Sequence, residues 1–151
     1  GIRDLVRSRG LGDVYKRQIK NRTGGPGGGE GPAHKALKLA IAANPALLGE
    51  AGLELVEVEY PFPTGDRIDV LLRDQVGRYV AVEVEGPCGD DEIAGPLQCM
   101  KYRALLAYTF RRPVHEVRAL LAAPSVARSV RERLQFHGVE ICETGTLAPS
   151  A

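Results

Sequence analysis

Three acidic residues stand at spacings that suit the binding of a divalent cation. Asp69 lies in an apolar segment, residues 67–72, and Glu83 and Glu85 stand two apart where a second apolar segment, residues 78–84, comes to its end. If both segments are strands, Glu83 and Glu85 point to one face, because side chains alternate along a strand. Hard oxygen ligands at this density suit Mg²⁺ or Mn²⁺ better than zinc.

The register of these two strands decides whether the three carboxylates meet. A five-residue loop at residues 74–78 places Asp69 opposite Glu83, whereas a four-residue loop places it opposite Val82. With the longer loop, each pair of like charges in the patch costs a fraction of ~1 kcal/mol, which a bound cation would remove. The plainer interpretation is a solvated acidic strand face, which is the usual state of a single glutamate.

Polar residues on the next predicted helix, residues 94–108, could complete such a site. Gln98 and Tyr102 are four residues apart and therefore lie one turn apart on one face, and Lys101 lies close to that face. Their plainer interpretation is the ordinary polar boundary of a helix. We expect the buried stripe of this helix to consist of Leu97, Met100, Ala104 and Leu105.

The composition is that of an ordinary soluble globular protein. The 151 residues are 44% hydrophobic and 26% charged, and the net charge is +1. Residues 50–92 hold twelve Asp and Glu against three Arg, whereas residues 93–143 hold eight Lys and Arg against four Glu. No apolar run approaches the ~20 residues that a membrane helix needs, and the three cysteines make neither a disulfide framework nor a metal pair. We expect a cytoplasmic protein with an acidic centre for cations beside a basic segment that faces a polyanion.

One ordered domain is expected, at residues 32–143. Residues 1–18 resemble translated sequencing-adapter read-through and are expected to be non-native, with an amphipathic helix as the alternative. Residues 19–31 are rich in glycine, as a flexible linker is, and residues 144–151 are expected to be a flexible tail. The chain does not begin with Met, and we expect that an upstream domain has been lost.

The first half of the domain is predicted to contain a helix and three strands. The helix begins near Pro32, and Leu37 and Ile41 mark its apolar face until the Asn44-Pro45 step interrupts it. Residues 53–60 alternate between apolar and acidic side chains, as a half-buried strand does. The two strands that carry the acidic patch follow.

The second half is predicted to alternate helices and strands. After the helix at residues 94–108 come a strand at residues 117–122 and a helix that Ser125 caps and Gly138 ends. Residues 139–142 form a last strand. The order α-β-β-β-α-β-α-β indicates an α/β sandwich with a mixed sheet.

Several of these segments resemble a known family. They are IAANPALLGE at residues 41–50, EYPFPTGDRIDVLLRD at residues 59–74, VAVEVEG at residues 80–86 and the Gln98-x-x-x-Tyr102 motif. Together they resemble the nuclease domain of the archaeal and actinobacterial mismatch endonucleases NucS or EndoMS, in the PD-(D/E)XK superfamily. The resemblance implies a restriction-endonuclease-like α/β core of order α-β-β-β-α-β, with a mixed sheet flanked by helices.

The resemblance also implies roles for the site residues. Asp69 and Glu83 would ligate Mg²⁺ or Mn²⁺, and Glu50 could hold a second metal or a water. Gln98 and Tyr102 would position the substrate or a metal-bound water. The implied activity is metal-dependent endonucleolytic hydrolysis of DNA phosphodiester bonds, in repair, restriction or defence.

Glu85 departs from the family pattern, which has Lys at this position. That lysine normally stabilises transition-state charge or orients the attacking water. Glu85 could be a further metal ligand or a general base, the positive charge could come from Lys101 on the facing helix, or catalysis could be lost while nucleic-acid binding remains. We favour an active enzyme, because the other motif residues are all present.

Basic residues are the candidate contacts for DNA, the expected partner. They are Arg67, Lys101, Arg111 and Arg112. Solvated surface charge is an equally good interpretation for each. The three histidines, His34, His115 and His137, are far apart and are expected to be ordinary surface or cap residues. The pattern leaves a homodimer open, and a non-catalytic interaction domain is a further alternative.

Overall fold

The computed structural model describes residues 31–145 of the chain. Contacts divide the chain into two units, and the described residues belong almost entirely to the second, Ala33–Ala151. The predicted read-through segment lies outside the described residues, as do the predicted linker except Gly31 and the predicted tail beyond Gly145. No helix among the described residues is long and apolar enough to cross a membrane.

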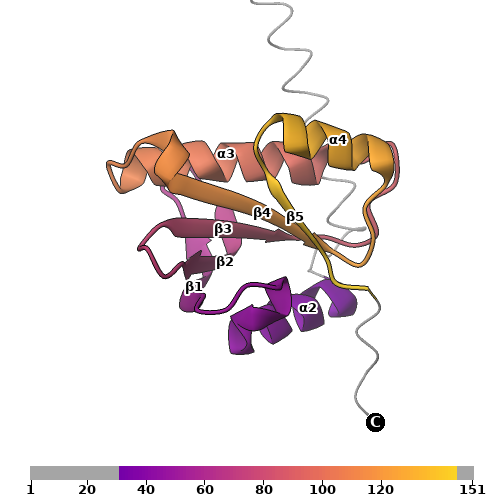
Figure 1. Cartoon of the computed structure of the whole chain (residues 1–151), viewed down its shortest axis with the longest axis horizontal. Helices are drawn as coiled ribbons and strands as arrows, with labels where there is room; N and C mark the ends of the chain where they lie inside the picture. Colours follow the sequence, from indigo (N-terminus) through magenta and orange to yellow (C-terminus); the bar gives the residue numbers. More distant parts are fainter. Residues whose placement is uncertain (1–30, 146–151) are drawn as a thin grey trace, which may run out of the picture. The chain divides into compact units, whose positions relative to one another are not determined.

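A five-stranded mixed sheet lies at the centre of this unit (Figure 1), with the strands in the order β1-β2-β3-β4-β5. β1, β2 and β3 are antiparallel neighbours, and β3, β4 and β5 are parallel. The predicted order is confirmed, and two short 3₁₀ helices, η1 and η2, are added within the described residues. The elements are α2 (Pro32–Ala43), η1 (Pro45–Leu48), β1 (Glu54–Pro61), β2 (Arg67–Arg73), β3 (Tyr79–Val84), α3 (Ala94–Thr109), η2 (Val114–Glu116), β4 (Val117–Ala123), α4 (Arg128–Phe136) and β5 (Glu140–Glu143).

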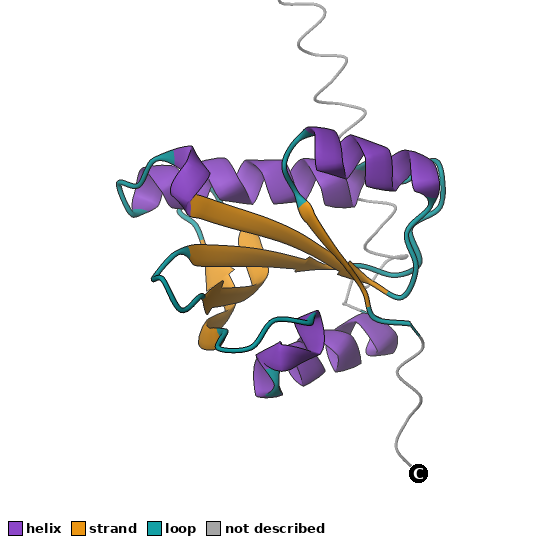
Figure 2. Cartoon of the chain, viewed as in Figure 1, coloured by secondary structure: helices purple, strands orange, loops and turns teal. Residues whose placement is uncertain are grey.

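Helices cover both faces of the sheet (Figure 2), with α3 and α4 on one face and α2 on the other. The alternation of side chains in β3 explains this arrangement. Val80, Val82 and Val84 pack in one cluster with Leu37 and Ile41 of α2. The residues between the valines face the side of α3, where Ala81 packs in one cluster with Tyr102 and Leu106.

β1 forms one edge of the sheet and is more exposed than its pattern predicted. Leu55 and Val56 are each 45% exposed, and the register with β2 shifts between Leu55 and Glu57. The prediction of a strand is confirmed. The predicted half-buried alternation holds in the second half of β1, where Val58 and Tyr60 are partly buried between exposed neighbours, and fails in the first half.

The buried stripe of α3 also differs from the predicted one. Ala104 is exposed, whereas Cys99, Tyr102 and Leu106 are buried at spacings of three and four residues. The Tyr102 ring stacks on Phe62 with 6.1 Å between centroids. Tyr102 is therefore a core residue, and its interpretation as a polar boundary residue is wrong.

α4 begins two residues later than predicted, at Arg128, because Ser125 does not cap it. The Ser125 carbonyl accepts the Cys88 N–H at 2.9 Å, which ties this loop to the segment after β3. Ala127 occupies the position before the helix and makes no side-chain cap. The predicted end of the helix is confirmed at Gly138, whose φ of 68° suits glycine.

Candidate active site

The strands β2 and β3 separate at the predicted acidic patch. Their antiparallel pairing ends at Val70 and Val82, and the next position places Asp69 opposite Glu83, as the five-residue loop predicts. There the Val84 N–H donates to the Asp69 carboxylate, Oδ2, at 2.8 Å. The Asp69 side chain therefore takes the place of a main-chain acceptor and fills the fork between the two strands.

The acidic residues at this fork are covered. The Asp69 side chain is 17% exposed, and Glu83 and Glu85 are 6% and 8% exposed. Carboxylates are rarely buried this deeply unless they are paired or coordinate a metal. The interpretation as a solvated acidic face is therefore wrong.

Glu85 lies against the first turn of α3. A Cβ built at Gly95 would lie 2.8 Å from Glu85 Oε1, 3.0 Å from its Cγ and 3.1 Å from Leu121 of β4. Glycine at this position is what lets the helix approach the carboxylate so closely. An acid is also electrostatically favourable at the N-terminal end of a helix. Glu85 stands where the family pattern has lysine, and it packs against the N-terminal turn of α3.

His34 of α2 is a site residue that the sequence reasoning missed. Its Nε2 lies 3.3 Å from Asp69 Oδ2, and its side chain is 26% exposed. His34 stands three residues before Leu37 and seven before Ile41, which are buried core residues. This helical spacing could have indicated that His34 faces the sheet.

Gln98 and Lys101 of α3 lie in two different settings. Gln98 follows Gly95 by three residues, and its Oε1 is buried with no hydrogen-bond partner among the described residues. Lys101 Nζ donates to Asp66 Oδ1 at 2.6 Å, so the structure places Lys101 at Asp66. Burial acts to raise the pKa of Asp66, but hydrogen bonds from Lys101 and Thr64 bring it below its ordinary value. A buried amide oxygen without a partner indicates a water, ion or ligand, so Gln98 remains a candidate site residue.

Glu50, for which the resemblance implies a second metal or a water, is held by an arginine in the structure. Both Glu50 oxygens accept hydrogen bonds from Arg118 of β4, at 2.9 and 2.6 Å. These bonds are the main reason that the pKa of Glu50 is lowered. Arg118 also donates to Glu140, and hydrogen bonds to these carboxylates raise its own pKa. The Glu50 carboxylate is therefore engaged in a structural network.

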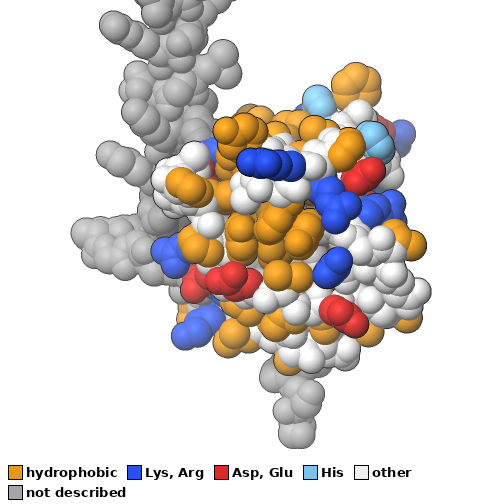
Figure 3. All heavy atoms as spheres, turned by 90° about the vertical axis from the view of Figure 1, so that its left-hand side faces the viewer, with side chains coloured by type: hydrophobic (Ala, Val, Ile, Leu, Met, Phe, Trp, Pro, Cys, Tyr) orange, Lys and Arg blue, Asp and Glu red, His pale blue; other side chains and the backbone are white. Residues whose placement is uncertain are grey.

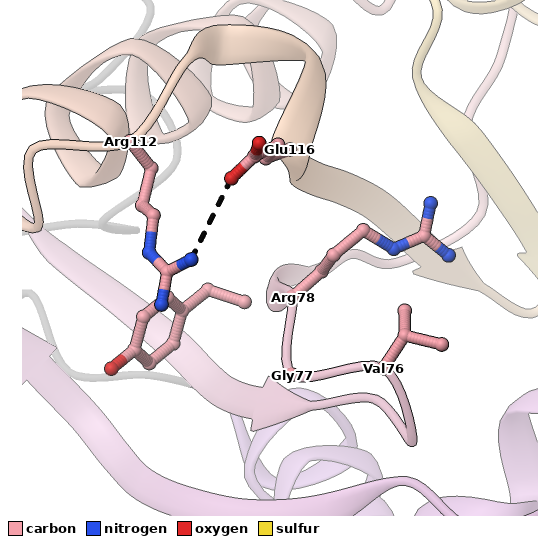
Figure 4. Close-up of a pocket in the computed structure, with 6 residues that line it drawn as sticks. Val76, Gly77, Arg78, Arg112 and Glu116 are labelled. Carbon is pink, nitrogen blue, oxygen red and sulfur yellow. Dashed lines mark ion pairs between the residues drawn. The ribbon is translucent and has the colours of Figure 1, made fainter.

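The opposite end of β3 holds a basic cavity of about 280 Å³. Figure 4 shows Arg78 and Arg112 on two sides of it, with Arg112 paired to Glu116 at 3.6 Å. Figure 3 looks onto this end of the domain, where an apolar area has basic side chains beside it. Arg112 and the neighbouring Arg111 thus lie away from the fork. Arg67 lies near it, because its Nη1 is 3.9 Å from Glu59, which stands opposite Asp69 in the register of β1 and β2. No paired carboxylates line this cavity, so we place the candidate chemistry at the fork.

The donor set at the fork suits Mg²⁺. Among residues 31–145, no three His, Cys, Asp or Glu side chains converge closely enough to hold a metal ion. The predicted three-carboxylate cluster is therefore not formed. Mg²⁺ needs no such cluster, because it usually keeps several waters and binds through one or two carboxylates and the substrate phosphates. Asp69 and Glu83 can supply those two carboxylates.

The sheet and the fork define the class of protein. A mixed five-stranded sheet, with helices on both faces and buried acids where the second and third strands part, is consistent with the PD-(D/E)XK nuclease fold. The family model described as the endonuclease NucS C-terminal domain matches residues 34–149. The chain belongs to this family.

Known relatives agree with this assignment. Endonuclease NucS of Mycolicibacterium smegmatis is 44% identical over 70 residues, which are 46% of this chain and 29% of that protein. An EndoMS-dsDNA2 complex has a TM-score of 0.62 at 26% identity, covering 79% of this chain and 45% of that one. A repair endonuclease from Pyrococcus abyssi has a TM-score of 0.61 at 25% identity, covering 76% and 47%. The chain thus spans less than half the length of these relatives.

Proposed function

We propose that this domain is a metal-dependent endonuclease that hydrolyses phosphodiester bonds in DNA. The observation that carries the proposal is the pair of covered acids at the strand fork, Asp69 and Glu83, in a chain of the NucS C-terminal family. The relatives are named endonucleases, and one structural neighbour was solved as a complex with double-stranded DNA. These names support DNA as the substrate.

Asp69 and Glu83 would hold the ion, Mg²⁺ or Mn²⁺. When bound, the ion would neutralise charge on the phosphate and make a nearby water more acidic. In the reaction, the water oxygen bonds to phosphorus and the bond from phosphorus to one sugar oxygen breaks. The water loses a proton and the leaving oxygen gains one, so the products are a phosphate end and a hydroxyl end.

The chain's own polar groups would orient and deprotonate the water. The buried Oε1 of Gln98 lacks a hydrogen-bond partner among the described residues and can accept a hydrogen bond from a water. Glu85 is the candidate general base, because a carboxylate in this covered position can accept the proton that the water loses. Tyr102 would support this arrangement from the core, through its stacking on Phe62.

A second candidate function is DNA binding without cleavage. The observation that favours it is Glu85, an acid packed against Gly95 where the family pattern has lysine. Loss of that positive charge would remove stabilisation of the transition state. This alternative predicts salt-sensitive binding to DNA and no strand cleavage in either metal.

The test is cleavage of labelled DNA by the full chain. Single-stranded, duplex and mismatched substrates would be incubated in Mg²⁺ and then in Mn²⁺, beside Asp69→Ala and Glu85→Lys. Asp90→Ala is a matched acidic control, because Asp90 is exposed on the loop before α3. We expect the parent and Asp90→Ala to cleave and Asp69→Ala to be inactive.

The outcomes separate the two functions. Cleavage that Asp69→Ala retains at the parent rate would place the chemistry elsewhere. Binding without cleavage by the parent, together with cleavage by Glu85→Lys, would identify the chain as a binding module disabled at position 85. Neither binding nor cleavage by the parent would contradict both candidate functions.

A further inference from the structure

Lys38 of α2 is a buried charged residue that the reaction outlined above does not use. It is 4% exposed, and lysine is almost never buried this deeply unless it is paired. Its Nζ donates to Glu59 Oε1 at 3.2 Å. The Glu59 side chain is 51% exposed, so the Lys38 ammonium lies at the boundary between the covered interior and solvent.

One face of α2 contacts acids of the first two strands. His34 and Lys38 are four residues apart and therefore share that face. His34 reaches Asp69 on β2, and Lys38 reaches Glu59 on β1. The pairs on either side of Glu59 in the register place it opposite Asp69. Glu59, Asp69 and Glu83 thus occupy one row across three strands, which we call the carboxylate row.

The backbone at Glu59 departs from a regular strand. Its φ is 55°, in the left-handed region that residues other than glycine rarely adopt. The regular pairs Val58 with Val70 and Tyr60 with Ile68 flank it. Strained residues of this kind persist only where the surrounding structure imposes them, and they cluster at functional sites. The carboxylate that holds Lys38 is therefore placed there by a local distortion of β1.

A site that binds a phosphate beside three acids needs positive charge. Position 85 holds an acid, and the structure places Lys101 at Asp66. We propose that Lys38 supplies the missing cation by contacting an oxygen of the DNA phosphate bound next to Asp69 and Glu83. This inference rests on the proposed nuclease function. Because an ammonium has three donors, a phosphate oxygen can share it with Glu59. The low dielectric around a covered cation strengthens its effect on transition-state charge.

The experiment combines DNA binding with cleavage in the full chain. Lys38→Met keeps most of the aliphatic stem and removes the charge, and Lys38→Arg restores a charge. Lys35→Met is the matched control, because Lys35 is an exposed lysine of the same helix. For each variant, the affinity for a DNA duplex would be measured across a salt series without divalent metal. Single-turnover cleavage would be measured in Mg²⁺, and Tm would be measured as a check on folding.

Loss of one phosphate contact lowers the slope of log affinity against log salt by about 0.9 for B-DNA. We expect this change in Lys38→Met, with a cleavage rate lower by about 100-fold or more, as for loss of one transition-state donor. Lys38→Arg should have the slope of the parent again, and Lys35→Met should have the slope and the cleavage rate of the parent. A lower Tm in Lys38→Met with an unchanged slope would show a purely structural ion pair and overturn the proposal.

The slope also separates this proposal from the proposed function. If the parent does not cleave but Lys38→Met lowers the slope of log affinity against log salt, the phosphate contact is supported and the proposed nuclease activity is refuted. If the parent cleaves and Lys38→Met keeps both slope and rate, the nuclease stands and the role of Lys38 is overturned. If Lys38→Met does not fold, the double variant Lys38→Met with Glu59→Gln gives the same test. It removes both charges of the pair, so neither partner is left without its counterpart. A parent that does not bind DNA overturns both proposals.

Discussion

Replacing Gly95 with alanine should expose how tightly α3 is pressed onto Glu85. The added Cβ would meet Glu85 Oε1 at 2.8 Å, Glu85 Cγ at 3.0 Å and the Leu121 side chain at 3.1 Å. The carboxylate end of Glu85 could move if it were on a surface, but Glu85 is 8% exposed and Leu121 is fully buried. The crowding must therefore be relieved by a shift of the helix or of the strand end.

The expected magnitude is the difference between two opposing effects. Overpacking of a covered site typically costs about 1–3 kcal/mol. Alanine in place of glycine gains at most about 1 kcal/mol of helix propensity, and less in a first turn, where Gly95 lies. We expect Gly95→Ala to lower the free energy of unfolding by about 1 kcal/mol, which is a fall in Tm of roughly 4 °C for a domain of this size.

A double-mutant cycle with Glu85→Ala tests the cause. Two of the three close contacts belong to Glu85, so in the Glu85→Ala background Gly95→Ala should be neutral or stabilising. The four proteins would be compared by urea denaturation, and the coupling free energy should be about 1 kcal/mol, within the range for residues in contact. Equal destabilisation in both backgrounds would refute the packing of α3 on Glu85.

Two further predictions concern acid stability and metal binding. The pKa of Glu50 is lowered mainly by Arg118, and that of Asp74 is lowered by Arg78 and Arg118 despite its burial. The stabilisation that these two carboxylates give is therefore present above their ordinary pKa values of 4.5 and 3.8 and is lost as the pH falls below them. In Arg118→Met, the free energy of unfolding should fall less steeply between about pH 5 and 3. A pH dependence of urea denaturation that is unchanged from the parent would contradict this. Mg²⁺ or Mn²⁺ at about 100 times its Kd should stabilise the parent by about 2.7 kcal/mol, and a rise in Tm that persists in Asp69→Ala would show that the ion binds elsewhere.

The strand register at the fork could be predicted from the sequence because it depends on local geometry. The length of the turn after β2 determines which residue lies opposite Asp69, and the alternation of side chains then places Glu83 beside it. The valines of β3 determine which face packs against α2. These relations hold within a pair of neighbouring strands, so spacing reduces the register to two alternatives, and the structure has the one with the five-residue loop.

Contacts between distant elements could not be predicted in the same way. His34 and Lys38 reach the carboxylate row only because α2 crosses the sheet at one particular position, and spacing does not specify that position. Glu50 was assigned to the metal by resemblance. Arg118, which holds it, is 68 residues away in the chain. The left-handed backbone at Glu59 has no signature in the sequence either, because glycine is the residue expected there.

The packing around Glu85 also predicts the outcome of restoring the family's lysine. The space beside Glu85 does not admit even a methyl group at Gly95 without crowding, and a lysine is longer than a glutamate. Its ammonium would also lie at the positive end of the α3 dipole, which favours an acid. We therefore expect Glu85→Lys to lower Tm and to cleave DNA no faster than the parent. A faster rate at unchanged Tm would show that position 85 still accepts the cation, and it would remove the reason for assigning that charge to Lys38.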